Sequence, residues 1–438
     1  MIKVCKFGGT SMADANAIRQ VKSIIEADES RRYVVVSAPG KRFKDDIKIT
    51  DMLYRCNAEV VEKGDCKESF AVIRQRFIEI VKDLGLTIDI ESILDKTEKE
   101  IVETKCADFA ASRGEYLSAI VISAFLGYEF VDAADIIRFD SHGKLNQDYT
   151  DDKTSNKLAN VERAVIPGFY GKNFQGSIKT FSRGGSDITG SIIARAVKAE
   201  LYENWTDVSG FLVCDPRIVP EAKVIKQITY KEVRELSYMG ASVLHAEAIS
   251  PVMKRRIPIN IKNTFKPEDK GTMIVPNEQY VSDDTIITGI AGKKNFTVLL
   301  IEKSMMNAEV GFIRKVLSVV EHYDLCVEHL PSGIDTLSIV IESDQLKNGV
   351  LSDLVSDIRE NVNPDYVHVI ENISLIATVG HGMARRPGTA ATLFTALANA
   401  NINIKMIDQG SSELNIIIGV ANTDYEKCIK VIYDAFNR

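Results

Sequence analysis

The chain opens with IKVCKFGGTS, residues 2–11, and the order of elements in this stretch recurs through most of the chain. A short apolar strand runs into the paired glycines Gly8 and Gly9. Apolar residues then recur at helical spacing: Ile18, Val21, Ile24 and Ile25. Paired glycines between a strand and a helix let backbone N–H groups approach a phosphate, and the helix N-terminus adds partial positive charge. An ordinary tight turn is the simpler interpretation of two glycines taken alone.

Outward from this stretch, short apolar runs alternate with helical patterns up to about residue 265. Strands interleaved with helices predict a mostly parallel sheet covered by helices on both faces. Residues 63–110 differ, because many Lys and Glu separate apolar residues at helical spacing, which predicts a helical layer. A chain of 438 residues, at ~150 residues per domain, has room for about three domains.

Two further motifs come after predicted strands. One is SRGGSD, residues 182–187, and the other is WTDVSGF, residues 205–211, with DPR at 215–217. Ligands of parallel α/β sheets bind outside the carboxyl ends of the strands, so three motifs at such ends together indicate one site. Asp187 would also serve simply as a helix cap, which does not exclude a role in chemistry. A fourth piece, SRGE at 112–115, is predicted just before a helix, where a solvated glutamate is the simpler interpretation.

The C-terminal third contains an internal repeat at an offset of 77 residues. Each copy reads as a strand, a loop with Gly, an amphipathic helix, a strand, a tight turn and a strand, and the copies open at 298–301 and 374–379. The matched pairs are Gly311 with Gly388, Val316 with Leu393, Leu317 with Phe394, Val320 with Leu397, Leu325 with Ile402, Val327 with Ile404, Ile339 with Ile416 and Ile341 with Ile418. We therefore predict two related βαββαβ modules after the large domain.

Composition and charge exclude several classes of protein. The 61 acidic and 54 basic residues give a net charge of −7, with no long basic block, which argues against nucleic-acid binding. The seven cysteines form no C-x-x-C pair, as expected of reduced thiols in the cytoplasm. Apolar stretches fall short of the ~20 residues that span a bilayer. The six histidines show no zinc-ligand spacing, so we predict no metal site built from the chain's own residues.

In their order, Lys6–Ser11, Ser182–Asp187 and Trp205–Arg217, together with the two repeats after them, resemble an aspartate kinase over essentially the whole chain. The resemblance implies an amino-acid kinase fold, with a mostly parallel central sheet and helices on both faces, and then two ferredoxin-like ACT domains. The length implies the monofunctional form, without the homoserine dehydrogenase fused to some members. The implied domains are 1–285 (catalytic), 286–370 (effector-binding ACT domain) and 371–438 (second ACT domain, for dimerisation and regulation).

The implied reaction transfers the γ-phosphoryl group of MgATP to the side-chain carboxylate of L-aspartate. It gives 4-phospho-L-aspartate, at the first step of lysine, threonine and methionine biosynthesis. A carboxylate with an ordinary pKa of ~3.9 is ionised at neutral pH, so no general base is required. Catalysis must then come from positioning and charge neutralisation. The resemblance implies that Lys6 stabilises charge on the transferring group and that Asp187 holds Lys6 or the magnesium in place.

The resemblance also assigns ligand contacts. The implied aspartate-binding residues are Ser37, Thr50, Glu115, Arg183, Gly184, Gly185 and Ser186. Among them, Arg183 pairs with the α-carboxylate, Glu115 receives the α-ammonium, and Thr50 falls in the loop region after a predicted strand. The implied ATP-binding residues are Lys6, Gly8, Gly9, Thr10, Thr206, Asp207, Leu212 and Arg217. Ser242 departs from the family, because many members have a lysine of the nucleotide site at this position.

ACT domains of this family bind free amino acids as effectors between two chains. The implied effector residues are Asn307, Gly311, Phe312, Ser332, Gly333, Ile334, Asp335 and Thr336. We expect lysine to be the inhibitor, with Asp335 meeting an ammonium group, and threonine to be the alternative. A solvated hairpin tip is an equally simple interpretation of Asp335. An effector site between chains implies a homodimer or a dimer of dimers.

Three other functions remain possible at this point. Another amino-acid kinase could act on glutamate or its acetylated form, although the tandem repeats and the Glu115 motif favour aspartate. An amino-acid sensor with an inactive kinase domain is disfavoured by the intact Lys6, Arg183 and Asp187. An ACT-bearing dehydrogenase is disfavoured because Gly380-His381-Gly382 has Arg385 in place of the third glycine of a dinucleotide fingerprint.

Overall fold

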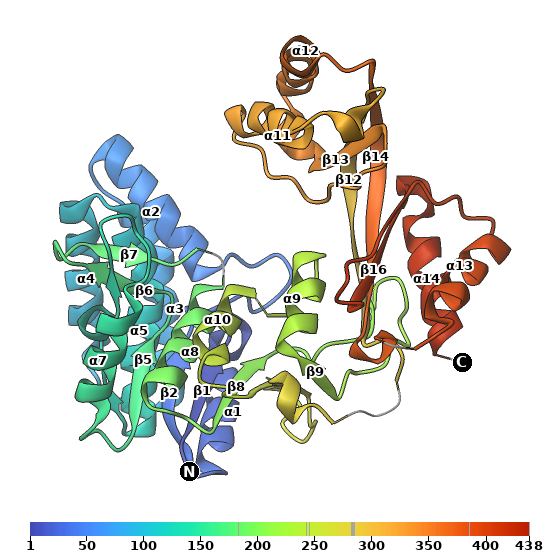
Figure 1. Ribbon diagram of the computed structural model, residues 1–438. Coiled ribbons are helices and arrows are strands. Elements are labelled where there is room, and N and C mark those ends of the chain that lie inside the picture. The colour runs from blue at the N-terminus through green and yellow to red at the C-terminus, as the bar shows by residue number, and fades with distance from the viewer. Residues whose placement is uncertain (183, 242, 245, 282–284, 385, 438) are drawn as a thin grey trace. The chain divides into compact units, whose positions relative to one another are not determined.

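A computed structural model gives the fold and describes residues 1–182, 184–241, 243–244, 246–281, 285–384 and 386–437. The chain divides into two compact units (Figure 1). The first comprises Met1–Phe211, Val224–Val233 and Ser242–Val281. The second comprises Leu212–Lys223, Arg234–Ala241 and Ser282–Arg438. The domain boundaries at 285/286 and 370/371 stay predictions.

The first unit alternates strands and helices along the chain. Its strands are β1 (Lys3–Phe7), β2 (Arg31–Val36), β3 (Glu129–Phe130), β4 (Arg138–Phe139), β5 (Ala164–Pro167), β6 (Tyr170–Asn173), β7 (Ile178–Thr180), β8 (Leu201–Thr206), β9 (Gln227–Thr229), β10 (Ile259–Asn263) and β11 (Thr272–Val275). Its helices are α1 (Ala15–Glu26), α2 (Ile49–Lys63), α3 (Lys67–Leu84), α4 (Ile90–Thr104), α5 (Ala107–Leu126), α6 (Ala133–Ile136), α7 (Gln147–Leu158), α8 (Gly185–Ala196) and α10 (Ile249–Met253). The short 3-10 helix η1 (Gly9–Met12) comes after β1, and α9 (Tyr230–Tyr238) has residues in both units.

An eight-stranded sheet in the order β3-β5-β2-β1-β8-β10-β11-β9 forms the centre of this unit. The pairs from β3 through to β10 are parallel, and β11 runs antiparallel to β10. The predicted mostly parallel sheet is thus confirmed. The chain builds β2, β3 and β5 on one side of β1 and then crosses to β8 and β10 on the other. Such a reversal of strand order opens a crevice at the carboxyl ends of the strands.

Helices cover both faces of the sheet, as predicted. On one face Cys5, Phe7 and Trp205 join a buried apolar core with side chains from α1 to α5. On the other face Lys6 and Tyr202 contact α8. The α1 helix begins cleanly because the Asp14 side chain accepts hydrogen bonds from the amides of its first turn.

The predicted helical layer at 63–110 is confirmed as α3 and α4 with the adjoining ends of their neighbours. Two local predictions were wrong. Ser112–Glu115 lies inside α5 rather than before a helix, and Thr50 lies in the first turn of α2 rather than in a loop. Within α5 the small size of Gly114 serves packing, because a Cβ there would lie 2.7 Å from the Ala38 Cβ.

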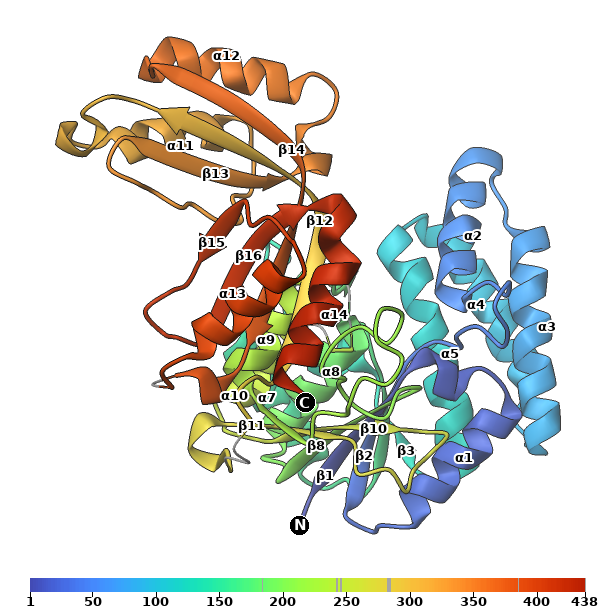
Figure 2. The same cartoon turned by 90° about the vertical axis from the view of Figure 1, so that its right-hand side faces the viewer.

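The second unit contains a five-stranded antiparallel sheet in the order β13-β12-β14-β16-β15. Its strands are β12 (Gly289–Glu302), β13 (Thr336–Glu342), β14 (Tyr366–Val379), β15 (Met406–Asp408) and β16 (Asn415–Ala421). Its helices are α11 (Phe312–His322), α12 (Val350–Val362), α13 (Thr389–Asn399) and α14 (Tyr425–Phe436). The long strands β12 and β14 pass through both halves of this unit, with α11 and α12 in one half and α13 and α14 in the other (Figure 2).

The internal repeat is visible in this arrangement, because α11 and β13 recur as α13 and β16. The two copies are not separate modules that follow one another, because they share the strand β12. The first residues of β12, 289–293, pair with 375–379 of β14, whereas its last residues, 296–302, pair with β13 and the start of β14. The strand that opens the first copy therefore also completes the sheet of the second, which leaves less unpaired edge on β14.

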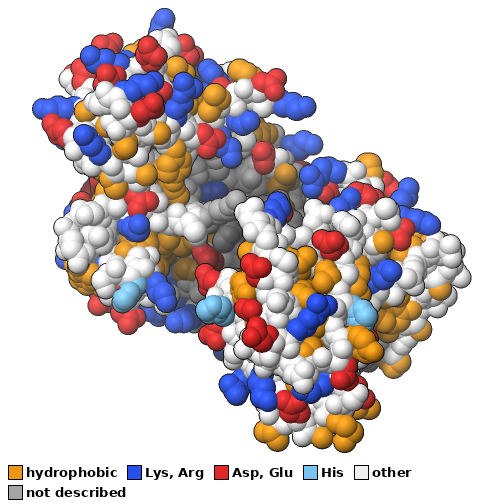
Figure 3. All heavy atoms as spheres, turned by 90° about the horizontal axis from the view of Figure 1, so that it is seen from above, with side chains coloured by type: hydrophobic (Ala, Val, Ile, Leu, Met, Phe, Trp, Pro, Cys, Tyr) orange, Lys and Arg blue, Asp and Glu red, His pale blue; other side chains and the backbone are white. Residues whose placement is uncertain are grey.

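The surface carries charges of both signs. On the face that Figure 3 shows, Lys and Arg side chains are interspersed with Asp and Glu. Among the helices of the described ranges, none is long and apolar enough to cross a membrane.

Gly190 allows α8 to lie close to β8, and this gives a prediction about stability. A Cβ at 190 would lie 2.5 Å from the hydroxyl oxygen of the buried Tyr202. Gly→Ala in a helix is otherwise favourable by about 1 kcal/mol, but here overpacking should lower the free energy of unfolding by about 1–3 kcal/mol. Thermal unfolding of Gly190→Ala should show a lower Tm; an unchanged or higher Tm would contradict this packing.

Candidate functional site

The loops after the parallel strands meet at one edge of the first unit. Residues 8–11 come after β1, residues 37–40 after β2, residues 168–169 after β5 and residues 206–207 at the end of β8. SRGGSD arrives by a different route from the one the sequence indicated. It comes after β7, which lies in a separate three-stranded sheet with β4 and β6, and it reaches this edge as the start of α8.

Lys6 and Asp187 form a buried ion pair at the centre of this edge. Lys6 Nζ lies 2.6 Å from Asp187 Oδ1, and the Lys6 residue is 8% exposed. The Nδ2 of Asn204 donates to the same carboxylate oxygen at 2.9 Å, and the Tyr202 hydroxyl donates to the Asp187 carbonyl at 3.0 Å. A buried charge is stable when paired and hydrogen-bonded, so this cluster is held rigidly.

Strand pairing explains why these side chains meet. Lys6 on β1 stands beside Asn204 on β8, and side chains at paired positions point to the same face. Asp187 lies in the first turn of α8, after Gly184 at φ 72°. The next glycine, Gly185, packs so closely that a Cβ would lie 2.6 Å from the Phe169 ring. Glycine is therefore needed for α8 to begin at this point.

Glu115 places a second carboxyl group in the same region. Its residue is 5% exposed, and its Oε2 has no hydrogen-bond partner among the residues that the structure describes. Burial raises the pKa of Glu115 to about 8, while the Ala38 amide and the positive charges of Arg113 and Lys6 act in the opposite direction. A buried carboxyl whose Oε2 has no partner among the described residues is able to receive a cationic group.

The glycine turn after β1 has its own geometry. The Gly8 amide donates to the Trp205 carbonyl at 2.9 Å, so this amide is already used within the protein. Gly9 and Thr10 open η1, and amides at the start of a helix have no acceptor within the helix. Gly40 crosses this turn so closely that a Cβ there would lie 2.6 Å from the Gly9 carbonyl carbon.

Arg76, which the sequence analysis did not single out, fixes the two crossing loops. It lies in α3, is 3% exposed, and donates to the carbonyls of Ala13 and Gly40 at 2.9 and 2.6 Å. It also pairs with Asp46 at 2.9 Å, and Arg42 and Arg76 together hold the pKa of the Asp46 carboxyl well below its usual range. Arg76 therefore connects the loop after β1 with the loop after β2.

A pocket of about 510 Å³ lies beside the glycine turn. Its wall includes Thr10, Asp207, Lys41, Arg42 and Phe265. Two of these residues, Thr10 and Asp207, belong to the predicted nucleotide set. Lys41 adds a positive charge to the wall, whereas Arg42 is paired with Asp46. The neighbouring Thr206 hydroxyl donates to the Asp207 carboxylate at 3.2 Å. Concave volume, helix-start amides and basic side chains suit an anionic ligand.

The remaining predicted substrate residues divide into those in the first unit and those outside the described residues. Ser37 directly follows β2, and its amide donates to the Phe7 carbonyl at 3.2 Å. Thr50 lies in the first turn of α2, and Gly185 and Ser186 lie in the first turn of α8. Arg183 and Ser242 lie outside the described residues.

Leu212 and Arg217, predicted to contact ATP, belong to the second unit. Arg217 is exposed, and its guanidinium pairs with Asp215 at 2.6 Å. This pairing lowers the pKa of Asp215 through its hydrogen bonds.

The predicted effector residues lie in two segments of the second unit. Asn307 lies in an exposed 3-10 turn, Gly311 precedes α11 at φ 78°, and the Phe312 side chain is buried. Residues 332–336 form the exposed tip before β13. The Lys303 amide, just after β12, donates to the Asp335 carbonyl at 2.9 Å, so the tip lies beside the end of β12, from which the chain runs on to Asn307.

Charged side chains also gather beside these segments. Glu309 pairs with Lys303 at 2.8 Å and with Lys315 at 2.6 Å, and these two lysines lower the pKa of Glu309. Sequence reasoning missed this triplet, because nothing in the spacing of the three residues indicates that they meet.

Asn204 is a functional candidate that the sequence analysis did not single out. In an alternating strand it lies on the same face as Tyr202 and opposite Glu203 and Trp205. Its position next to Lys6 depends on β8 pairing with β1, which the strand pattern alone does not give.

Within the described ranges, no group of three or more His, Cys, Asp or Glu side chains is arranged to hold a metal ion.

Comparisons with known proteins agree on one family. Residues 1–263 match the amino acid kinase family, and residues 376–436 match an ACT domain. Aspartokinase 3 of Bacillus subtilis (strain 168) is 35% identical over 452 residues, covering 99% of this chain and 98% of that protein. The crystal structure of Clostridium acetobutylicum aspartate kinase is 52% identical with a TM-score of 0.91, and each chain covers 100% of the other. Escherichia coli aspartokinase III in complex with lysine and aspartate is 25% identical with a TM-score of 0.76, again over 100% of both chains.

The raised pKa of Glu115 gives a prediction about stability. The folded chain keeps the proton up to about pH 8, whereas the unfolded chain releases it near the usual glutamate pKa of 4.5. The folded state then binds more protons, so stability falls as pH rises between these two values. Glu115→Gln should therefore be stabilising, by about 2 kcal/mol more at pH 8 than at pH 6.

Urea unfolding at the two pH values measures this difference. The matched control is Glu62→Gln, on the exposed side of α2, which should change stability equally at both pH values. A Glu115→Gln variant that is destabilised to the same extent at pH 6 and pH 8 would contradict a protonated Glu115.

Proposed function

The chain belongs to the aspartate kinases of the amino acid kinase family, and on this premise we propose its reaction, site residues and regulation. The reaction is transfer of the γ-phosphoryl group of MgATP to the side-chain carboxylate of L-aspartate, giving 4-phospho-L-aspartate. The observation that carries this proposal is the buried Lys6–Asp187 pair beside the Glu115 carboxyl, whose Oε2 lacks a partner among the described residues.

Aspartate supplies what Glu115 lacks. An α-ammonium group beside Oε2 would give the carboxyl a charge partner and would favour its ionised form. The first turn of α8, with Gly185 and Ser186, presents amides and positive dipole to an acidic ligand. In this proposal Ser37 and Thr50 line the same pocket, and Arg183 pairs with the α-carboxylate.

The chemistry requires charge neutralisation rather than proton transfer. The attacking carboxylate is already ionised at neutral pH, so the protein needs no general base. Lys6 stabilises negative charge that develops on the transferring phosphoryl group, and Asp187 with Asn204 fixes the Lys6 side chain in advance. The amides of Gly9 and Thr10 and the pocket beside them receive the phosphates of ATP, with Asp207 in the pocket wall and Thr206 next to it in sequence. Leu212 and Arg217, in the second unit, stay predicted ATP contacts.

Magnesium enters this proposal with the nucleotide, to which it supplies positive charge at the phosphates. The contacts of Asp187 with Lys6 and Asn204 both use Oδ1, so Oδ2 is the oxygen that would hold the ion. A single carboxylate fits this role, because Mg²⁺ is usually bound through one or two carboxylates together with substrate phosphates.

We assign feedback inhibition to lysine, bound at Asn307, Gly311, Phe312 and the 332–336 tip, with threonine as the alternative effector. The bond from the Lys303 amide to the Asp335 carbonyl places the tip beside the strand end that leads to Asn307, which supports one binding site, and the lysine complex of the Escherichia coli relative supports the ligand. The proposal further includes a homodimer or dimer of dimers formed through ACT domains, a cytoplasmic location and the first step of lysine, threonine and methionine biosynthesis.

The direct test is ATP-dependent formation of aspartyl phosphate, trapped as the hydroxamate. The wild-type chain should form the hydroxamate from L-aspartate but not from L-glutamate. Product from glutamate alone would point to another amino-acid kinase, and absence of product from either would point to a sensor without catalysis.

Loss of Lys6 tests the catalytic assignment. Lys6→Met should lower kcat by ~10²–10³-fold, the range seen when one group that stabilises developing charge is removed. Lys63→Met, an exposed lysine at the end of α2, is the control for loss of one positive charge. Equal kcat values for Lys6→Met and Lys63→Met would remove Lys6 from the catalytic site.

Loss of Asp335 tests the effector assignment. We expect Asp335→Ala to require at least tenfold more lysine for half-inhibition, because the ammonium group loses its carboxylate. Asp344→Ala, another exposed carboxylate of the same unit, should leave the lysine dependence as in the wild type. The measurement is the ratio of initial rates with and without lysine over a range of lysine concentrations. The assignment would be contradicted if Asp335→Ala and the wild type were inhibited to the same extent at each concentration.

A further inference from the structure

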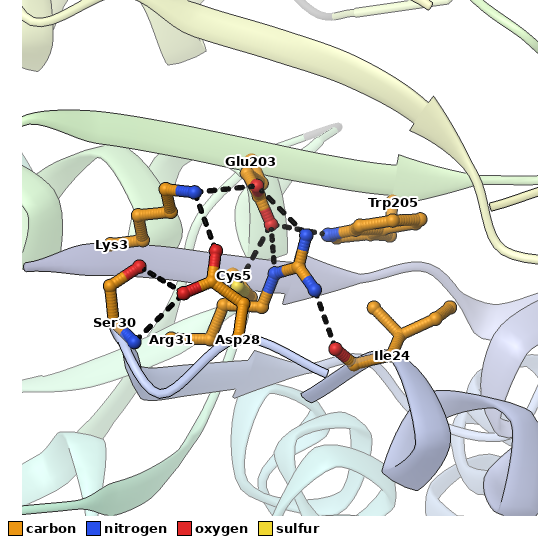
Figure 4. Close-up of polar contacts among 8 residues, drawn as sticks. All are labelled: Lys3, Cys5, Ile24, Asp28, Ser30, Arg31, Glu203 and Trp205. Atoms are coloured by element: carbon orange, nitrogen blue, oxygen red, sulfur yellow. Dashed lines mark hydrogen bonds and ion pairs between the residues drawn. The ribbon is translucent and has the colours of Figure 1, made fainter. Parts of the chain in front are cut away.

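A second buried polar cluster lies under the glycine turn, on the face of the sheet that points away from Lys6. Its centre is Glu203 on β8, which is 2% exposed (Figure 4). Register places Glu203 beside Cys5 and Trp205 beside Phe7, while Asn204 between them points to the opposite face with Lys6. Three consecutive residues of β8 therefore contribute to both faces of the sheet: Asn204 to the Lys6 face, and Glu203 and Trp205 to the opposite face.

One carboxylate oxygen of Glu203 accepts hydrogen bonds from three side chains. Its Oε2 accepts from Arg31 Nε at 2.8 Å, from the Trp205 indole N–H at 3.0 Å and from the Cys5 thiol at 3.3 Å (Figure 4). Lys3 Nζ lies 3.9 Å from its other oxygen. Burial raises the pKa of the Cys5 thiol, which keeps it an S–H donor. A buried carboxylate with a paired guanidinium and several donors is held in one geometry.

Trp205 transmits that geometry to the glycine turn. Its ring is buried, stacks on Phe7 with centroids 5.9 Å apart, and has the Arg31 and Lys262 cations 5.2 and 5.0 Å from its centroid. The Glu203 bond fixes the indole edge, so the ring has no freedom to turn. The carbonyl of this same residue accepts the Gly8 amide at 2.9 Å.

We propose that Glu203 is a positioning residue for phosphoryl transfer, which holds the Gly8–Gly9 turn in place through Trp205. The inference rests on the proposed function, because it assigns the glycine turn to the phosphates of ATP. Glu203 itself touches neither substrate. Its effect is to fix the carbonyl to which the turn is bonded, so that the free amides after Gly8 keep one orientation.

Glu203→Gln is the first test, because the amide has nearly the shape of the carboxylate but turns an N–H₂ toward the donors of Arg31 or Trp205. Asp28→Asn is the matched control. Asp28 belongs to the same cluster through Lys3 at 2.6 Å, but it is not bonded to Trp205 (Figure 4). Trp205→Phe is the second variant. It keeps an aromatic ring against Phe7 and leaves the Glu203–Arg31 pair in place.

The readouts are the Kd for MgADP by calorimetry, the KM values for both substrates, kcat and Tm. We expect Glu203→Gln and Trp205→Phe each to weaken MgADP binding and raise the KM for ATP at least fivefold, with the KM for aspartate within twofold of wild type. Asp28→Asn should match the wild type in all binding constants. The double variant should bind MgADP no more weakly than the weaker-binding single variant, because both changes break the same Glu203–Trp205 link.

A purely structural role predicts a different result and would overturn the proposal. In that case Glu203→Gln lowers Tm, but the folded protein binds MgADP with the wild-type Kd and keeps the wild-type KM for ATP. Emission of Trp205, the only tryptophan in the chain, provides an independent signal. MgADP should change the emission of the wild-type chain, and an unchanged emission at saturating MgADP would also overturn the link. The binding readouts need no catalysis, so they stand even if the hydroxamate test fails.

Discussion

The ion pair between Lys6 and Asp187 is the contact on which the rest of the site depends. Its two atoms are 2.6 Å apart and largely shielded from water, so neither charge is stable there without the other. The pair joins β1 to the first turn of α8, and Asn204 adds β8. β1 thus meets two much later elements, the consecutive α8 and β8, at the point where the strand order reverses, and the lysine is oriented before any ligand arrives.

Glu115 shows the complementary condition, a buried acidic group that the described part of the chain leaves without a partner at Oε2. Such a group lowers stability at neutral pH and above, because burial keeps it protonated while the unfolded chain would ionise it. A protein gains nothing in stability from this arrangement, which is why we assign it to function. Lys6 is paired and preorganised, whereas we propose that Glu115 receives the cationic group of the substrate.

Much of this could be predicted from the sequence, and particular residues show where prediction ended. The alternation of strands and helices indicated the parallel sheet, and glycine pairs marked the start of η1 and of α8. Asn204 and Arg76 were missed, because their roles depend on which strands pair and which loops cross, and these are long-range facts. Ser112–Glu115 was placed before a helix but lies inside α5, where the small size of Gly114 lets the helix approach Ala38. The dual pairing of β12 was equally invisible, since a repeat shows similarity but not which copy supplies a shared strand.

The measurement that tests the proposed role of Glu115 most directly is the proton balance of aspartate binding at pH 7, by calorimetry in buffers of different ionisation enthalpy. Glu115 is protonated in the free enzyme, and the ammonium group of aspartate would favour its carboxylate, so binding should release roughly one proton per aspartate. The release should vanish in Glu115→Gln. Binding of aspartate to the wild-type chain with no proton exchanged, or with proton uptake, would contradict this role.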